Sequence, residues 1–81
     1  RWVQGVKDID AIVFIREEQP GYHKLSFRSM TVDVNRFAAR YGGGGHRNAS
    51  GCHLNGELDQ IIAMVIKDFG QALEEADSTN A

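Results

Sequence analysis

Residues 42–51 read Gly-Gly-Gly-Gly-His-Arg-Asn-Ala-Ser-Gly, and this stretch decides how the chain around it is divided. Gly42 is a natural helix end, since glycine readily adopts the left-handed conformation that follows a last helical turn. One glycine is enough for that role, so Gly43, Gly44 and Gly45 need another reason. Without Cβ atoms they let a ligand approach the main chain, where neighbouring N–H groups bind phosphate well. The alternative is a flexible linker, but linkers usually mix serine with glycine, so we favour ligand binding.

Helices and a strand are predicted on both sides of this stretch. Before it, residues 34–41 place apolar side chains at the spacing of one helix face, and Thr31 or Asp33 can cap the helix start. After it, residues 49–54 read as a short strand. Residues 57–77 then carry apolar side chains at helical spacing over several turns, which predicts a long second helix.

The first third of the chain predicts two antiparallel strands. Residues 10–16 form a continuous β-branched and aromatic run, which indicates burial on both faces of a strand. Residues 22–29 alternate between apolar and polar side chains, and Pro20 and Gly21 fit the centre of a type II turn. We therefore expect one α+β domain over 1–81, with order β-β-α-β-α and a small mixed sheet that carries two helices on one face.

The composition excludes several protein classes. The chain has 81 residues, of which 42% are hydrophobic and 25% charged, a globular and not a disordered composition. No apolar run approaches the roughly 20 residues that span a bilayer, and no signal peptide is evident. A single cysteine, Cys52, cannot form an internal disulfide or a cysteine-based zinc site. We interpret Cys52 as a packed residue in a reducing compartment.

Charge is distributed unevenly along the chain. Residues 22–53 hold five Lys or Arg against one Asp, whereas the remainder holds four basic and ten acidic residues, for a net charge of −2. A basic segment within an acidic chain indicates an anionic ligand, although a solvated surface would look the same. The overall acidity argues against a non-specific binder of duplex DNA.

Five side chains in the basic segment are candidates for contacting that ligand. His46 follows the glycines and can donate to a phosphate or stack on a base. Arg28 lies at a strand end and can hold two phosphate oxygens at once. Arg47, Asn48 and Ser50 can contact a phosphate or a base edge. These residue types at these positions predict the binding of an anion.

No catalytic constellation accompanies these candidates. The sequence shows no Asp and His residues at metal-ligand spacing and no Ser-His-Asp arrangement. We interpret His53 as structural and His23 as a surface residue. We therefore assign no catalytic residue and no metal ligand, and we expect a domain that is not catalytic alone.

Three segments together resemble a known family. They are Arg28-Ser29 closing a strand, Val32-Asp33-Val34-Asn35 opening a helix, and residues 42–51. They resemble the DHH-associated C-terminal domain, the substrate-binding half of the DHH phosphoesterases, and are most similar to the bacterial nanoRNase/pAp phosphatase branch. They are also similar to cyclic-di-AMP phosphodiesterases and RecJ exonucleases. The substrate-binding residues that the resemblance implies are Arg28, Ser29, Gly43, Gly44, Gly45, His46, Arg47 and Asn48.

The resemblance also implies partners. The ligand would be a nucleotide or a short single-stranded RNA or DNA. An N-terminal DHH domain of the same polypeptide would bind Mn²⁺ and catalyse phosphoester hydrolysis, so this chain would be a piece of a longer two-domain protein. The chain itself would need no cofactor. A cytoplasmic bacterial protein without membrane contact is implied, and homodimer formation stays open.

Two other classes remain open. One is an RNA-binding module related to the C-terminal domain of alanyl-tRNA synthetase, which also has a glycine-rich segment. The other is a dimerisation or regulatory module in which the glycines only pack against a helix. The His-Arg-Asn-Ala-Ser-Gly continuation at residues 46–51 favours the phosphoesterase branch.

Overall fold

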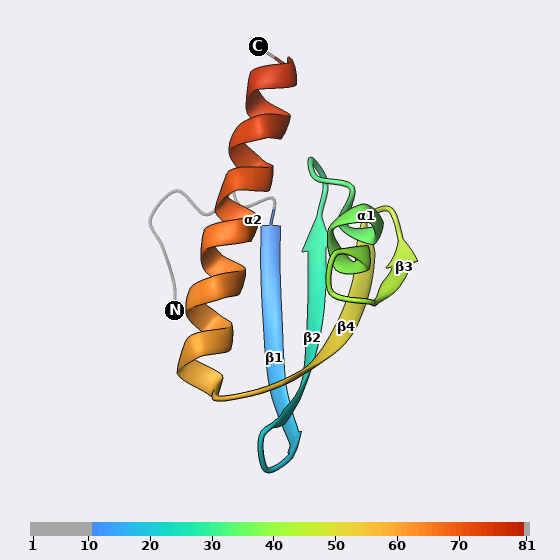
Figure 1. The fold of residues 1–81 in the computed structure, drawn as a ribbon. Helices are drawn as coiled ribbons and strands as arrows, with labels where there is room; N and C mark the ends of the chain where they lie inside the picture. Colours follow the sequence, from blue (N-terminus) through green and yellow to red (C-terminus); the bar gives the residue numbers. More distant parts are fainter. Residues whose placement is uncertain (1–10, 81) are drawn as a thin grey trace.

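The computed structural model describes residues 11–80, with side chains described as far as Ala76. Four strands and two helices form an α+β fold, which confirms the predicted class (Figure 1). The predicted start of the first strand, Asp10, lies outside the described residues. The elements are β1 (Ala11–Gln19), β2 (Tyr22–Ser29), α1 (Val34–Ala39), β3 (Gly44–His46), β4 (Ala49–Asn55) and α2 (Leu58–Asn80).

The strand β3 is an addition to the predicted order, which becomes β-β-α-β-β-α. It has three residues, two of them glycine, and glycine is depleted in strands, so no β signal marks it in the sequence. The spatial order is β1-β2-β4-β3, and every strand pairing is antiparallel. The expectation of a mixed sheet was therefore wrong. After β2 the chain passes through α1 to β3 at the far edge of the sheet and then enters β4. The strands β2 and β3, on either side of β4, are both antiparallel to it.

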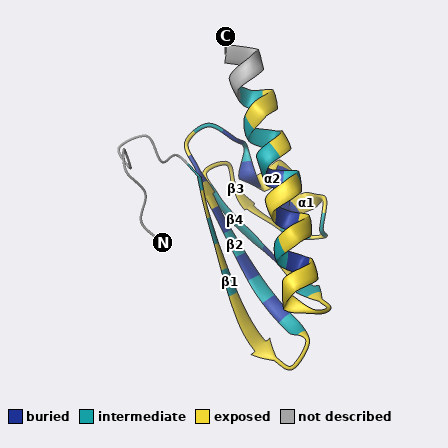
Figure 2. Cartoon of the chain, turned by 90° about the vertical axis from the view of Figure 1, so that its left-hand side faces the viewer, coloured by how far each residue is buried: buried dark blue, intermediate teal, exposed yellow. Residues whose placement is uncertain are grey.

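Both helices lie on one face of the sheet, as predicted (Figure 2). The core between the layers contains Leu25 and Phe27 from β2, and three aromatic rings meet there. The Phe27 ring lies 5.1 Å from the Phe37 ring of α1 and 5.9 Å from the Phe69 ring of α2. The phenol of Tyr41 donates a hydrogen bond of 2.6 Å to Asp68, which ties the end of α1 to α2. Burial and this carboxylate raise the Tyr41 pKa, so the phenol stays protonated.

The strand β1 is buried on one face only. Its side chains alternate, and Ile12 and Phe14 remain 43% and 57% exposed. The prediction of burial on both faces was wrong because the helices cover one face and β1 is an edge strand. The turn that follows β1 agrees with the sequence, since Gly21 has the positive φ of 74° that a type II turn requires.

Gly70 provides a test of how α2 is stabilised. A Cβ atom at this helical position would meet no other atom within 4 Å. Gly70→Ala should therefore raise the free energy of unfolding by about 0.5–1 kcal/mol, because alanine loses less backbone entropy in a helix. Urea denaturation measures the change. Ala63→Gly, on the exposed side of the same helix, is the matched control and should lower the free energy by a similar amount. A loss of stability in Gly70→Ala would contradict this account.

Candidate functional site

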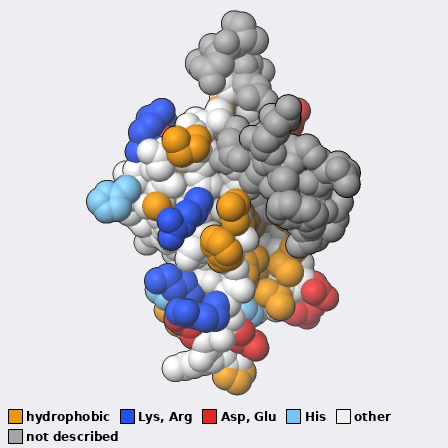
Figure 3. All heavy atoms as spheres, turned by 180° about the vertical axis from the view of Figure 1, so that it is seen from behind, with side chains coloured by type: hydrophobic (Ala, Val, Ile, Leu, Met, Phe, Trp, Pro, Cys, Tyr) orange, Lys and Arg blue, Asp and Glu red, His pale blue; other side chains and the backbone are white. Residues whose placement is uncertain are grey.

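The face of the sheet away from the helices carries the side chains that could bind a ligand. We call it the open face. Figure 3 views the molecule from this side and shows Lys, Arg and His side chains gathered around exposed hydrophobic ones. Because side chains alternate along a strand, the register fixes which residues share this face. They are Ile12, Phe14, Arg16, Lys24, Ser26, Arg28, Gly44, His46, Ala49, Gly51 and His53.

Arg28 and His46 are brought together on the open face. Ala49 pairs with Arg28 on one side and with His46 on the other, so the two cationic candidates flank a methyl group. Strands lie about 4.8 Å apart, which places their Cα atoms roughly 10 Å from each other. A hollow of about 350 Å³ lies beside Arg28 and is also lined by Ile12 and Asn48. This hollow gives a ligand group room beside Arg28.

The glycine run has an internal structural role that the sequence did not reveal. Gly42 has a φ of 82° and ends α1, and the N–H groups of Gly42 and Gly43 donate to Ala39 and Ala38. This is the bond pattern of a Schellman motif. A Cβ atom on Gly43 would lie 2.6 Å from the Cβ of Cys52. Gly43 is thus required by its close approach to β4.

Gly45 also packs against β4, because a Cβ there would lie 2.7 Å from the Cα of Ser50. Its N–H donates to the Asn35 side chain at 2.8 Å. The N–H groups of Gly42, Gly43 and Gly45 are therefore used inside the chain, and Gly44 pairs with Gly51 in the sheet, which differs from the expected array of free amides. Among Gly43, Gly44 and Gly45, only Gly44 has space beside it, since a Cβ would meet only the Asn35 Oδ1 at 3.3 Å.

Ser29 lies on the covered face of the sheet, opposite Arg28. The side chain is 4% exposed, and its oxygen accepts hydrogen bonds from the N–H groups of Thr31 and Val32 at 3.0 and 2.9 Å. The Asn48 amide donates to the Ser29 carbonyl at 2.8 Å. These bonds fix the turn from β2 into α1, so Ser29 stabilises the site from the covered face of the sheet.

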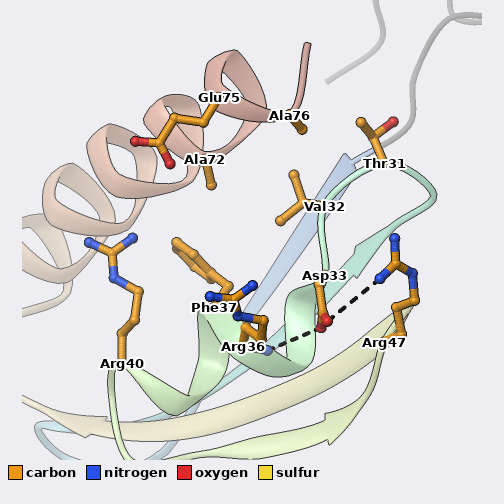
Figure 4. Close-up of a pocket in the computed structure, with 10 residues that line it drawn as sticks. All are labelled: Thr31, Val32, Asp33, Arg36, Phe37, Arg40, Arg47, Ala72, Glu75 and Ala76. Atoms are coloured by element: carbon orange, nitrogen blue, oxygen red, sulfur yellow. Dashed lines mark hydrogen bonds and ion pairs between the residues drawn. The ribbon is translucent and has the colours of Figure 1, made fainter. Parts of the chain in front are cut away.

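Arg47 points away from the open face. Its carbonyl accepts from the Val34 N–H at 2.8 Å, and its guanidinium lies 3.7 Å from the Asp33 carboxylate. With Arg36 and Arg40 it lines a separate hollow of about 500 Å³ between the two helices (Figure 4). The sequence grouped Arg47 with His46 because the two are adjacent, but adjacent residues on a strand and its turn need not share a face.

The interpretation of His23 as a surface residue was wrong, because His23 is 1% exposed. The alternation of β2 explains the error, because odd-numbered positions such as Leu25 point inward. His53, which we interpret from the sequence as structural, stands on the open face. His53 stacks on Tyr22 with ring centres 5.3 Å apart, and its Nε2 lies 3.2 Å from the Glu18 carboxylate.

Cys52 is buried, as predicted, and burial raises the pKa of its thiol, which disfavours the nucleophilic thiolate. Within residues 11–76, no three His, Cys, Asp or Glu side chains lie together in a group that could hold a metal ion. The described helices include none that is both long and apolar enough to span a bilayer.

The family model described as the DHHA1 domain matches residues 3–76. This chain belongs to the DHHA1 domain family. Over 56 residues the domain is 39% identical to the bifunctional oligoribonuclease and PAP phosphatase NrnA of Mycoplasma pneumoniae. Over 58 residues it is 37% identical to the oligoribonuclease NrnB of Bacillus subtilis.

The DHHA1 domain corresponds to a small part of these relatives. Each match covers 69% of this chain but only 17% of the Mycoplasma protein and 14% of the Bacillus protein. The family therefore establishes the type of domain. The activities in the relatives' names belong to chains several times longer.

Gly43 and Gly44 should differ in their tolerance of a side chain. We expect Gly43→Ala to lose about 1–3 kcal/mol of stability, because its Cβ overlaps β4. We expect Gly44→Ala to stay within about 0.5 kcal/mol of the parent, since it faces one movable side-chain atom. Thermal denaturation of the two variants measures the difference. Equal losses would show that the close contact with β4 does not fix Gly43.

Ser29 should act on stability and not on ligand affinity directly. Ser29→Ala leaves the buried Val32 N–H without its acceptor, which costs about 1–3 kcal/mol. Ser26→Ala, on the open face, is the matched control and should change stability by less than about 0.5 kcal/mol. Urea denaturation tests both. A neutral Ser29→Ala would refute the structural role.

Proposed function

We propose that this DHHA1 domain binds a nucleotide or a short single-stranded oligonucleotide as the binding half of a DHH-family phosphoesterase. The observation that carries the proposal is the pairing of Arg28 and His46 across Ala49 on a face that the helices leave uncovered. The family membership and the names of the relatives support the same class of ligand.

Each residue of the site has a part in this proposal. Arg28 holds a phosphate through two guanidinium N–H groups, and none of the described carboxylates lies within ion-pair distance of it. His46 donates to the phosphate or stacks on the base. Gly44 leaves space beside β3, and Asn48 lines the hollow next to Arg28. Gly43, Gly45, Ser29 and Arg47 keep β3 and the turn in place.

Hydrolysis belongs, in this proposal, to a DHH domain that binds Mn²⁺. The described residues do not fit a metal site, since no group of three metal-binding side chains occurs among them. The part played by this chain is to hold the substrate's phosphate and base in a fixed orientation, which lowers the entropic cost of reaction elsewhere. We place the parent protein in the bacterial cytoplasm, in keeping with the bacterial origin of both relatives.

Titration of the 81-residue chain with pAp, followed by NMR, tests the proposal. We expect a dissociation constant near or above roughly 100 µM, about −5.5 kcal/mol, because in this proposal a DHH domain supplies the other half of the site. Shifts should centre on Arg28, Gly44 and His46. Arg28→Ala and His46→Ala should each weaken binding about tenfold or more, since a charged hydrogen bond is lost.

Arg36→Ala is the matched control, because Arg36 lies on the helix side, and it should leave the affinity unchanged. Shifts confined to α2, or an equal effect of Arg36→Ala, would contradict the proposed site. Tighter binding of a tRNA than of pAp would favour the alternative RNA-binding module.

A further inference from the structure

A second row of residues crosses the open face next to the Arg28 row. The register pairs Phe14 with Ser26, Ser26 with Gly51, and Gly51 with Gly44. The Phe14 ring is 57% exposed. Phe14 pairs directly with Ser26, and the row continues through Gly51 and Gly44, so the ring stands at one end of a row without other large side chains. A planar nucleic-acid base fits against such a ring and row, because any base can stack on an aromatic side chain.

Lys24 stands in the third row, between two hollows. The hollow on one side, of about 370 Å³, is also lined by Phe14, Arg16 and Ser26. The hollow on the other side, of about 290 Å³, is bordered by Gly42, Gly43 and Gly44 together with Gly51, Cys52 and His53. A phosphate bound to Lys24 would thus have room for a base on the side of Phe14.

The charges of this part of the open face favour an anion. Glu18 is the carboxylate here, and a hydrogen bond of 2.8 Å from Arg16 lowers its pKa, aided by the charges of Arg16, His53 and Lys24. Glu18 is therefore ionised at neutral pH and is held by Arg16. None of the described carboxylates lies within 4.0 Å of the Lys24 amine. The face keeps two cations, Lys24 and Arg28, for a ligand.

The spacing of these two cations matches more than one nucleotide. Lys24 and Arg28 lie four residues apart on β2, which is about 13 Å along a strand. Their side chains share a face, and the row of Phe14 lies between them. At that spacing each side chain can bind a phosphate of its own. Two phosphates of an extended single strand fit this arrangement, with a base between them against Phe14.

We propose that the open face holds a second nucleotide, with its base stacked on Phe14 and its phosphate bound to Lys24. This inference rests on the proposed function and specifies its ligand as a short single strand of at least two nucleotides, in preference to a mononucleotide. A protein surface covering the same face would be expected to bring apolar groups to Phe14 and a carboxylate to Lys24. The row of small residues and the unpaired cations suit a polyanion with planar bases better.

Calorimetric titration of the 81-residue chain with pAp and with a tetraribonucleotide tests the second subsite. The tetranucleotide should bind at least tenfold more tightly than pAp. Phe14→Leu should weaken tetranucleotide binding by about 5- to 150-fold, the effect of losing one stacked base, and leave pAp binding unchanged. Phe14→Tyr keeps the ring and should retain the affinity. Ile66→Ala, an apolar truncation on the exposed side of α2, is the matched control.

Lys24→Gln provides an independent readout. It should reduce the salt dependence of tetranucleotide binding by about 0.7 in the log–log slope, the value for one phosphate contact of a single strand. Binding of pAp should not change. This variant tests the subsite even where Phe14→Leu alters folding, because Lys24 contributes an amine at a half-buried surface position.

The outcomes separate the two proposals. Equal affinity for pAp and the tetranucleotide, with no effect of Phe14→Leu or Lys24→Gln, would overturn the second subsite and leave the proposed function standing. Absence of binding to both ligands would overturn the proposed function itself. Signals of Phe14 that respond to an added DHH domain but not to the tetranucleotide would identify the face as a domain interface, and the inference would be wrong.

Discussion

The close approach of the glycine backbone to β4 is the constraint on which the rest of the structure depends. Neither Gly43 nor Gly45 has space for a Cβ atom, since the main chain of β4 occupies it. This contact turns the chain back after α1 and makes three residues of low β propensity into a strand. It also fixes His46 at the end of that strand, opposite Ala49. The turn after His46 is then tied to α1 through the Arg47 carbonyl and to β2 through Asn48. The contact that packs the glycine backbone against β4 therefore also fixes the position of the candidate site.

The two faces of the sheet divide the work of folding and binding. The covered face gathers the aromatic residues Phe27, Phe37 and Phe69, and their burial supplies the main stabilisation of a thin core. The open face keeps cations and an exposed ring without disturbing that core. A site on strands is also held more rigidly than one on a loop, so less conformational freedom is lost when a ligand binds.

The sequence predicted those features that depend on local pattern. The alternation of β2, the helix cap at Asp33 and the long amphipathic helix all follow from neighbouring residues, and the structure confirms them. Contacts between residues that are far apart in the sequence could not be predicted from local pattern. The residues next to Gly43 in the sequence do not indicate that Cys52 packs against it. Likewise, the residues next to Ser29 do not indicate that its hydroxyl faces the covered side of the sheet. The exposure of Phe14 depends on which face of the sheet the helices cover, and the apolar run around Phe14 does not indicate that face.

The alternation of β2 has a consequence for how such a domain can diverge. Leu25 and Phe27 lie under the helices, while Lys24, Ser26 and Arg28 lie between them in the chain and face outward. A substitution at one of the outward positions changes the chemistry offered to a ligand but removes nothing from the core. Ligand preference and folding are thus encoded in interleaved sets of residues. Descendants of one ancestral domain can acquire different ligands by changing every second residue of a single strand, with little risk to the scaffold.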